Sequence, residues 1–247
     1  MNQAMQQRIR GLARQYGVGI ENKPVSLLNR PERELGLSVE MVAAHYGYTH
    51  DDDITMIQVG AFDGQSYDPL YNLVKKKNWR GVLLEPQKHA FERLRETHKN
   101  QPGLTFVNAA LSEEDGTRIL YTVKKGAPGA AWAQELASFD KNHLLKHEGH
   151  IPNVAQYIEE TIVDCITFDT LFQRYDLTHV NILQIDTEGF DFEVIKLYDV
   201  AKRKPEIINF EHKHLSKEDW SSCVELLINQ GYRVAKTGQD TLAYLVD

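Results

Sequence analysis

The sequence predicts an α/β fold, with a doubly wound, mostly parallel sheet, an antiparallel hairpin at its carboxyl end and a helical appendage at its amino end. Three observations support this prediction. From residue 54 onward, short apolar runs alternate with stretches of helical periodicity, which is typical of a parallel sheet covered on both faces. Only TGQD separates the last two apolar runs, so these strands form a hairpin. The 247 residues, 42% of them hydrophobic, suit one large domain with a buried core.

The amino-terminal region, residues 1–53, predicts a helical appendage that packs on the main domain. Apolar positions between residues 9 and 16 follow helical spacing, and a second such stretch lies near residues 37–46. Prolines interrupt the chain between the two stretches. A region of this size makes a poor independent domain. We therefore place the main domain at residues 54–247.

The main domain is expected to contain strands and helices in alternation. The strand candidates are short runs rich in valine, isoleucine and leucine, whereas the helix candidates are longer and carry apolar residues at helical spacing. We expect strands at residues 55–60, 81–85, 104–109, 180–186, 206–211, 232–236 and 241–246. We expect helices at residues 66–77, 87–99, 167–175, 190–199 and 216–230.

A long insertion interrupts this alternation. SEEDGTRILYTV predicts a turn and an additional strand, and residues 124–160 follow without a clear periodicity. Loops of such length are usually functional or mobile, so the insertion is either a lid, with Trp132 and Phe139 packed on a substrate, or a disordered surface segment. The tract HLLKHEGH, residues 143–150, resembles a metal-binding tract but lacks the HExxH spacing, and we interpret it as part of the lid.

Composition argues against several classes of protein. The net charge is −7 and the basic residues are scattered, which argues against nucleic acid and favours a small polar or neutral substrate. Cys165 and Cys223 lie far apart and form no CxxC, so neither a disulfide framework nor a zinc knuckle is indicated. No apolar run approaches the length of a membrane span, and no secretory signal is visible, so we expect a cytoplasmic protein.

The segment MIQVGAFDGQSYDP, residues 56–69, is a strand that runs into a glycine-containing loop. A strand, a glycine turn and a helix start present backbone N–H groups and a helix dipole to an anionic group. The dinucleotide fingerprint GxGxxG, counted from Gly60, requires two further glycines at positions that hold phenylalanine and glutamine. The loop therefore disfavours NAD. Gly60 and Gly64 instead give GxxxG, with Asp63 inside it.

The ends of the next two strands suggest an adenosine ligand. GVLLEP ends near Glu85, about 25 residues beyond Gly60, where a carboxylate can accept hydrogen bonds from both hydroxyls of a ribose. VNAALS places Asn108 at the same sheet edge, within reach of an adenine. Taken singly, Glu85 is better explained as a solvated strand-end acid, and the glycines as a tight turn. Their order and spacing together favour an adenosine with an amino-acid tail, which is S-adenosylmethionine.

Several segments together resemble the FkbM-type methyltransferases. They are IQVGAFDGQSYDPLY, GVLLEPQKHAFERL, FVNAALSEEDG, ILQIDTEGFDFEVIK and FEHKHLSKED, and the similarity covers about residues 54–247. The resemblance implies a class I methyltransferase fold with a Rossmann-like sheet, and S-adenosylmethionine as methyl donor. It also implies O-methylation of a hydroxyl group, commonly on a sugar or a natural product.

The resemblance also implies roles for particular residues. The first cofactor motif corresponds to the loop after the first strand, and Asp186, Glu188 and Gly189 correspond to the family's D-x-E-G motif. Phe62 departs from the small or polar residue expected there, commonly asparagine, which puts the contact to the methionine end in question. The predicted cofactor site is formed by Gly60, Ala61, Asp63, Gly64, Ser66, Glu85, Pro86, Asn108 and Ala109.

Acidic and histidine residues suggest the chemistry. Asp186 ends a central strand at the switch point of the sheet, and the next parallel strand brings Glu211 and His212 to the same edge. Methyl transfer from a sulfonium requires mainly that the acceptor be aligned and deprotonated. We expect His212 to be the base, with Asp186 or Glu211 orienting it or binding the acceptor. Alternatively, these three residues hold a divalent cation such as Mg²⁺. Asp191 and Glu193 are interpreted as acids that favour a first helical turn.

The leading hypothesis is an S-adenosylmethionine-dependent O-methyltransferase that acts on a small-molecule hydroxyl of a sugar or secondary metabolite. N-methylation stays open, as does the choice between a monomer and a homodimer. One alternative is an NAD-dependent reductase of similar topology, which the identity of the bound cofactor would distinguish. Another is a non-catalytic ligand-sensing or scaffold protein with a methyltransferase fold. Intact Gly60, Asp63, Glu85 and Asp186 argue against the second alternative.

Overall fold

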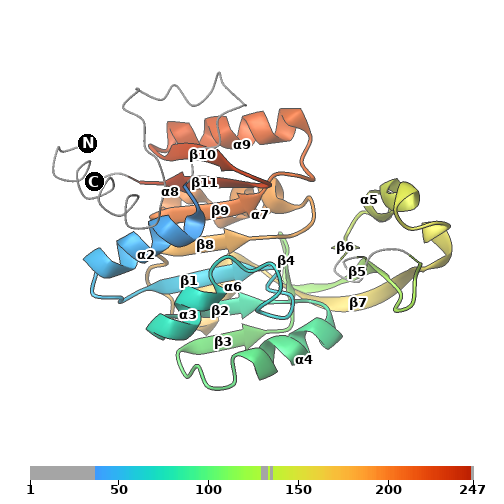
Figure 1. Cartoon of the computed structure of the whole chain (residues 1–247), viewed down its shortest axis with the longest axis horizontal. Coiled ribbons are helices and arrows are strands. Elements are labelled where there is room, and N and C mark those ends of the chain that lie inside the picture. Colours follow the sequence, from blue (N-terminus) through green and yellow to red (C-terminus); the bar gives the residue numbers. More distant parts are fainter. Residues whose placement is uncertain (1–36, 129–132, 134–135, 246–247) are drawn as a thin grey trace.

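The structure is a computed structural model, and it describes residues 37–128, 133 and 136–245. Its main sheet has seven strands in the order β10-β11-β9-β8-β1-β2-β3 (Figure 1). The strands are β1 (Thr55–Val59), β2 (Arg80–Leu84), β3 (Leu104–Val107), β8 (Ile182–Ile185), β9 (Ile207–Glu211), β10 (Arg233–Thr237) and β11 (Asp240–Tyr244). All pairings are parallel except those of β11, which runs antiparallel to both β9 and β10. The prediction of a doubly wound, mostly parallel sheet with a carboxyl-terminal hairpin is confirmed.

Alternate residues of the central strands build two separate cores. Met56, Leu83 and Ile182 pack with one set of helices, whereas Ile57 and Leu183 pack with the other. This period of two is what buries both faces of a parallel sheet. The first set is α2 (Val39–Thr49), α3 (Tyr71–Lys77) and α4 (Lys88–Thr97). The second set is α6 (Phe168–Arg174), α7 (Asp191–Tyr198), α8 (Val200–Arg203) and α9 (Lys217–Asn229).

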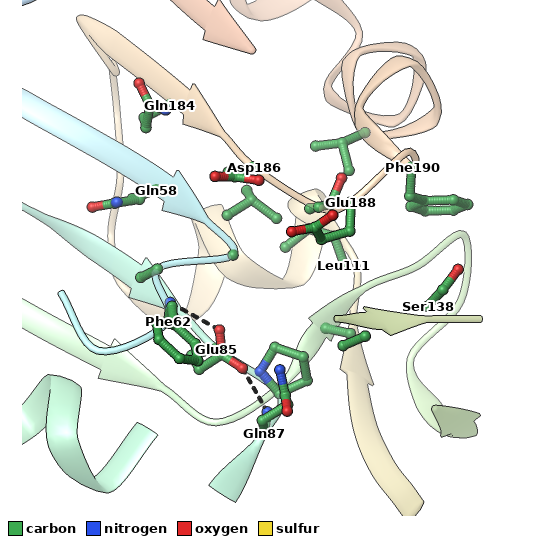
Figure 2. A pocket seen from close by; sticks show the side chains of 18 of the residues that line it. Gln58, Phe62, Glu85, Gln87, Leu111, Ser138, Gln184, Asp186, Glu188 and Phe190 are labelled. Carbon is green, nitrogen blue, oxygen red and sulfur yellow. Dashed lines mark hydrogen bonds between the residues drawn. The ribbon is translucent and has the colours of Figure 1, made fainter. Parts of the chain in front are cut away.

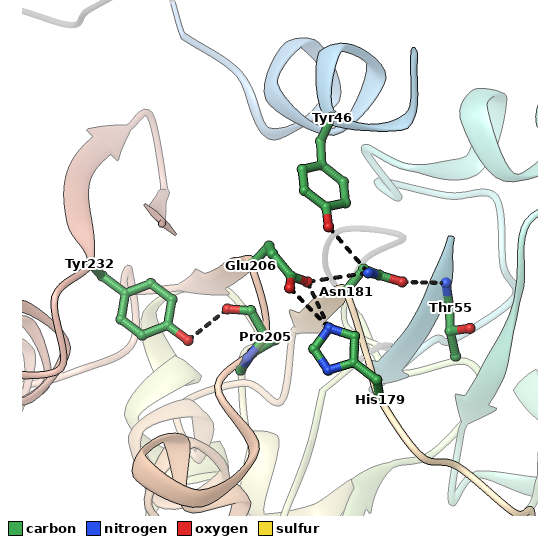
Figure 3. Close-up of polar contacts among 7 residues, drawn as sticks. All are labelled: Tyr46, Thr55, His179, Asn181, Pro205, Glu206 and Tyr232. Atoms are coloured by element: carbon green, nitrogen blue, oxygen red, sulfur yellow. Dashed lines mark hydrogen bonds and ion pairs between the residues drawn. The ribbon is translucent and has the colours of Figure 1, made fainter. Parts of the chain in front are cut away.

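The described part of the expected amino-terminal appendage is helix α2. Ser38 caps it by accepting a hydrogen bond from the Met41 amide, and Val39 and Ala43 are buried in the core beneath it. Tyr46 contacts a polar network at the amino ends of the strands, which Figure 3 shows. In this network Asn181 accepts a hydrogen bond from the Thr55 amide at 2.8 Å, and its amide nitrogen lies 3.3 Å from the Tyr46 hydroxyl. The helical stretch expected before α2 lies outside the described residues.

The insertion forms a second sheet, in the order β4-β7-β5-β6, which we call the arm (residues 110–166). Figure 1 shows it extending from the side where the strands of the main sheet end. Its strands are β4 (Ala110–Leu111), β5 (Gly116–Val123), β6 (Ala137–Ser138) and β7 (Ile158–Ile166), with helices α5 (Lys141–Leu145), η3 (Lys146–Gly149) and η4 (Val154–Gln156). A small core of its own, which includes Leu136, Leu144 and Ile151, stabilises it. The additional strand is confirmed as β5, and the described part of the insertion is ordered.

The differences from the expected elements have local causes. Helix α3 begins at Tyr71 instead of residue 66, because the chain makes successive turns through Asp63 and Asp68, whose carboxylates accept hydrogen bonds from following amides. Strand β7 was not expected, because residues 159–162 of its sequence are exposed and mostly polar. No helix among the described residues has the length and apolar composition needed to cross a membrane.

Candidate functional site

A pocket opens at the carboxyl ends of β1, β2 and β8, where the strand order reverses between β1 and β8 (Figure 2). Ligands of doubly wound sheets bind at such a switch point. The lining residues from the main sheet and its loops include Gln58, Gly60, Ala61, Phe62, Ser66, Glu85, Pro86, Ala109, Gln184, Asp186 and Glu188. Leu120, Ala137, Ser138 and Phe139 of the arm line it as well. The pocket therefore lies between the sheet and the arm.

Gly60 brings the end of β1 into close contact with the end of β8. Its φ is +78°, and a Cβ added here would lie 1.8 Å from the carbonyl oxygen of Asp186. The amides of Gly60 and Ala61 both donate to the carbonyl of Leu84, at 3.1 and 2.9 Å. Only glycine combines this backbone conformation with this close approach. The loop after β1 is thus fixed by the backbones of both neighbouring strands.

Glu85 projects from the end of β2 and is 3% exposed. Its Oε2 accepts a hydrogen bond from the Phe62 amide at 2.9 Å, and its Oε1 accepts one from the Gln87 amide at 2.8 Å, as Figure 2 shows. Burial raises the pKa of this carboxyl to about 7, although the two amides oppose the shift. Each oxygen keeps a further lone pair, so the side chain can accept hydrogen bonds from a ligand that enters the pocket.

Phe62 occupies the position where the family resemblance suggested asparagine. Its φ is +46°, a left-handed conformation that is unusual for a bulky residue and that asparagine tolerates better. The Arg93 guanidinium lies 4.8 Å from the centre of its ring, and the residue lines the pocket. Phe62 therefore contributes its backbone amide to Glu85 and an apolar surface to the pocket.

Three residues of the predicted cofactor site shape its walls without lining the pocket. Asp63 accepts hydrogen bonds from the amides of the next loop residues, at 3.1 and 2.7 Å. Gly64, with a φ of +73°, lies against His98, whose Nε2 is 2.9 Å from the Gly64 carbonyl oxygen. Asn108 donates to the carbonyls of Glu85 and Pro86, at 2.7 and 3.0 Å. The amide of Asn108 thus holds the loop after β2, where we had expected it to contact an adenine.

Asp186 lies open to the pocket at the end of β8. Figure 2 shows its carboxylate facing the cavity, across from the Glu85 loop. The surrounding protein desolvates the carboxylate and, together with Asp240, raises its pKa to about 6. Glu188 follows two residues later, in a turn where its own φ is +52° and that of Gly189 is +99°. The D-x-E-G segment is therefore a strained turn that directs two carboxylates toward the pocket.

Asp191 organises this turn. It is completely buried, and its Oδ2 accepts hydrogen bonds from the Thr187 hydroxyl at 3.0 Å and the Gly189 amide at 3.3 Å. Its Oδ1 accepts a hydrogen bond from the Glu211 amide at 3.2 Å, which ties the end of β9 to the turn after β8. The sequence interpretation of Asp191 as a first-turn helix acid missed this role. The burial of Asp191 could not be recognised from the sequence, because the residue lies in a stretch rich in acidic residues.

Replacing Asp191 with alanine should lower the free energy of unfolding by about 3 kcal/mol, because three partly buried amides and a hydroxyl lose their acceptor. Chemical denaturation measures this change. The matched control is Glu193→Ala on the same helix turn, where an exposed carboxylate pairs with Lys196 and the loss should stay within about 0.5 kcal/mol. Equal losses in the two variants would show that Asp191 has no organising role.

His212 does not join the acidic residues, contrary to the expected base and metal set. Strand β9 ends at Glu211, and a turn closed by the Leu215 amide on the His212 carbonyl follows, so strand alternation stops. The His212 Nδ1 lies 3.1 Å from the Thr241 hydroxyl, and its ring centre lies 6.0 Å from that of Trp220. Burial and the nearby Lys236 lower the pKa of this imidazole to about 4. The structure thus places His212 against β11, apart from Asp186.

His214 takes the place expected for His212. Its Nε2 lies 3.2 Å from Oε2 of Glu188 and 3.6 Å from Oε2 of Glu211. Burial lowers the pKa of His214 to about 4 and raises the pKa of Glu211 to about 9. Both shifts favour the neutral form of the side chain. Glu211 and His212 do not line the pocket, whereas Glu188 does. Glu188 therefore connects the pocket to the cluster behind it.

The arm adds two histidines to this cluster. The rings of His143 and His147, from α5 and η3, lie 5.4 and 5.9 Å from the ring of His214, centre to centre. His143 also packs against Gly189, where an added Cβ would lie 3.2 Å from the imidazole Cε1. Groups that could hold a metal are His143, His147 and His214, and Glu188, Glu211 and His214, with ligand atoms in each group within 4.8 Å of one another.

Other pocket residues were not anticipated from the sequence. Gln58 and Gln184 lie side by side on β1 and β8, each 4% exposed, and both line the pocket (Figure 2). Their Oε1 atoms are buried without a hydrogen-bond partner in the described structure. Such atoms are costly unless a ligand pairs with them. The signal was present in the sequence as a glutamine inside each apolar strand.

Aromatic rings of the arm and the sheet meet at the pocket rim. Phe139 and Phe190 form an edge-on pair with ring centres 5.8 Å apart, and the Arg118 guanidinium lies 4.0 Å from the Phe139 ring centre. Phe139 lines the pocket. Trp132, the other aromatic residue expected there, lies outside the described residues.

Comparison with known families gives a match over most of the chain. The family described as methyltransferase FkbM domain matches residues 58–234. A search of curated proteins gives no match.

Solved structures with a similar fold include methyltransferase FkbM from Methylobacillus flagellatus KT, at 13% identity and a TM-score of 0.50. The alignment covers 78% of this chain and 44% of that one, so this chain spans less than half of the longer protein. Precorrin-6y C5,15-methyltransferase from Geobacter metallireducens GS-15 has 13% identity and a TM-score of 0.42, and the alignment covers 91% of this chain and 94% of that one. The human METTL16 N-terminal domain in complex with SAH has 12% identity and a TM-score of 0.41, and the alignment covers 96% of this chain and 79% of that one.

Proposed function

The chain belongs to the FkbM methyltransferase family, and on this premise we propose that it transfers the methyl group of S-adenosylmethionine to a hydroxyl group of a sugar or natural-product acceptor. The observation that carries the proposal is the placement of Glu85. This buried carboxylate is held by two backbone amides beside a glycine turn, and it faces Asp186 across the same pocket. Glu85 is placed to bind the ribose of the donor, and Asp186 is placed to bind the acceptor hydroxyl.

The donor side of the pocket fits S-adenosylmethionine. Glu85 would accept hydrogen bonds from the two ribose hydroxyls, since it lines the pocket and each of its oxygens keeps a free lone pair. The buried, unpartnered Oε1 atoms of Gln58 and Gln184 are acceptors suited to the ammonium group of the methionine part. Ala61 and Phe62 line the pocket as well. When bound, the donor supplies an activated methyl group on a sulfonium.

The acceptor side is formed by Asp186 and the arm. Asp186 is the acid most directly open to the pocket. We therefore assign it the role of general base, which takes the proton from the acceptor hydroxyl. Ser138 offers a hydroxyl, and Phe139 and Phe190 offer an apolar wall for a ring-shaped acceptor. Alignment between donor and acceptor supplies the remaining rate acceleration. The sheet thus binds the donor, and the arm with the β8 turn positions the acceptor.

The affinity for S-adenosylhomocysteine should depend on pH through Glu85. The folded pKa of about 7 lies above the ordinary value, so lowering the pH through 7 protonates the carboxylate and removes acceptors for the ribose hydroxyls. Binding should be about tenfold weaker at pH 6 than at pH 8, with proton release on binding at pH 6. Calorimetric titrations in two buffers of different ionisation heat measure both quantities.

The control for this experiment is Glu85→Gln. This variant should bind more weakly than the wild type at pH 8, and its affinity should be the same at both pH values. Wild-type affinity that does not change between pH 6 and pH 8 would contradict the role of Glu85, as would an unchanged pH dependence in the variant.

A further inference from the structure

We propose that His143, His147, Glu188, Glu211 and His214 bind one divalent transition-metal ion, between the arm and the carboxyl ends of β8 and β9. The site differs from the metal set expected from the sequence, which consisted of Asp186, Glu211 and His212. Its role in the reaction, but not the binding of the ion, rests on the proposed function.

The geometry brings together donors from three separate segments. His214 is common to both candidate groups, and the ligand atoms of each group already lie within 4.8 Å of one another. The three imidazole rings form a nearly equilateral triangle, with centre-to-centre distances of 5.4, 5.6 and 5.9 Å. Ligand atoms about 2.0–2.2 Å from a metal lie at most about 4.4 Å apart, so within each group only a small contraction would be needed.

The donors are available and shielded. His143 Nε2 and Glu211 Oε2 are buried atoms with no hydrogen-bond partner in the described structure. The side chains of His214, Glu211 and Glu188 are only 14%, 12% and 22% exposed. Two carboxyl groups this close together and away from water disfavour the charged form of each without a balancing cation. A divalent ion would pair with the unsatisfied atoms of His143 and Glu211.

The chemistry of the donors indicates the class of metal. Imidazole nitrogens suit Zn²⁺, Fe²⁺, Ni²⁺ and similar ions, whereas Mg²⁺ requires mostly oxygen ligands and water. Three histidines in one cluster therefore favour a transition metal over Mg²⁺. The tract HLLKHEGH supplies His143 and His147 from consecutive turns, which places both rings on one side of α5 and η3.

The position of the ion would serve two purposes. It would join the arm to the β8 turn, because His143 and His147 come from the arm while Glu188 follows β8. Glu188 also lines the pocket, so an open coordination position on that side could receive the acceptor hydroxyl. Coordination to the metal would lower the pKa of this hydroxyl, and Asp186, two residues before Glu188, would take the proton.

The test is metal binding by the full chain after treatment with a chelator. Co²⁺ is the spectroscopic probe, and equilibrium dialysis against Zn²⁺ with elemental analysis gives the stoichiometry. We expect one ion per chain, visible bands of histidine-coordinated Co²⁺, a higher melting temperature with metal, and no competition by Mg²⁺. Elemental analysis that shows no saturable binding of Co²⁺ or Zn²⁺ would overturn the proposal.

Variants locate the site. His214→Gln and His147→Gln should each weaken Co²⁺ binding by about 100-fold or more, since the loss of an outer-shell partner alone costs about 10–100-fold. The matched control is His150→Gln, an exposed histidine of the same tract that is outside both candidate groups, and it should bind Co²⁺ as the wild type does. Far-ultraviolet circular dichroism confirms that each variant is folded. Equal Co²⁺ affinities in all three folded variants would overturn the assignment.

A parallel titration with S-adenosylhomocysteine separates this proposal from the proposed function. Binding of S-adenosylhomocysteine without binding of metal would refute the metal site and leave the methyltransferase proposal intact. Binding of Co²⁺ without binding of S-adenosylhomocysteine would refute the donor pocket and leave the metal site intact.

Discussion

Gly60→Ala is expected to abolish S-adenosylhomocysteine binding and to destabilise the folded chain by more than about 4 kcal/mol. An added Cβ would lie 1.8 Å from the Asp186 carbonyl oxygen and 2.8 Å from its carbonyl carbon, so β1 and β8 would have to separate where the donor pocket forms. The φ of +78° adds the cost of a left-handed alanine. Chemical denaturation and calorimetric titration measure the two effects.

Gly238→Ala is the matched control for this substitution. Gly238 also has a positive φ, +63°, but nothing lies within 4 Å of an added Cβ, so the variant tests the backbone cost alone. We expect a loss of about 1–2 kcal/mol and unchanged affinity for S-adenosylhomocysteine. If Gly60→Ala behaved like Gly238→Ala, the close contact between the two strand ends would have no importance for the pocket.

Asp186→Asn is expected to lower kcat for methyl transfer by about 10²–10⁴-fold, because the amide keeps the shape of the side chain but cannot accept the acceptor's proton. The affinity for S-adenosylhomocysteine should change by less than about threefold, since the assigned donor contacts lie elsewhere in the pocket. Release of S-adenosylhomocysteine with an accepted hydroxyl substrate measures kcat.

The control for Asp186→Asn is Glu193→Gln, which removes an exposed carboxylate on α7 whose partner is Lys196. It should leave both kcat and the affinity for S-adenosylhomocysteine unchanged. A wild-type kcat in Asp186→Asn would refute the role of Asp186 in deprotonation. A large loss of S-adenosylhomocysteine affinity would instead assign Asp186 to the donor.

The main sheet was predictable because its signals are local. Each buried strand is a short apolar run, and the TGQD turn alone determines that β10 and β11 are antiparallel. The arm was predictable only in part. Residues 159–162 of strand β7 are exposed and mostly polar, so apolar alternation is confined to its last residues. The strand forms because it pairs with β5 along eight residues. Tertiary pairing of this kind cannot be read from a local pattern.

The part of the candidate site that lies at the ends of the buried strands was predictable from the sequence. Gly60 and Glu85 follow directly from the strand–loop pattern, and both line the pocket. The choice between His212 and His214 was not predictable, because it depends on where β9 ends and how the next turn rotates the chain. His143 lies about seventy residues before His214 in the sequence, and only the folding of the arm brings their rings within 5.4 Å.

The most direct test of the proposed function is a calorimetric titration of the full chain at pH 8 with S-adenosylhomocysteine, followed by the same titration with NAD. The arrangement of Gly60, Glu85, Gln58 and Gln184 predicts saturable, micromolar binding of S-adenosylhomocysteine at one site per chain and no saturable binding of NAD. Failure to bind S-adenosylhomocysteine, or tighter binding of NAD, would contradict the assignment of this pocket to a methyl donor.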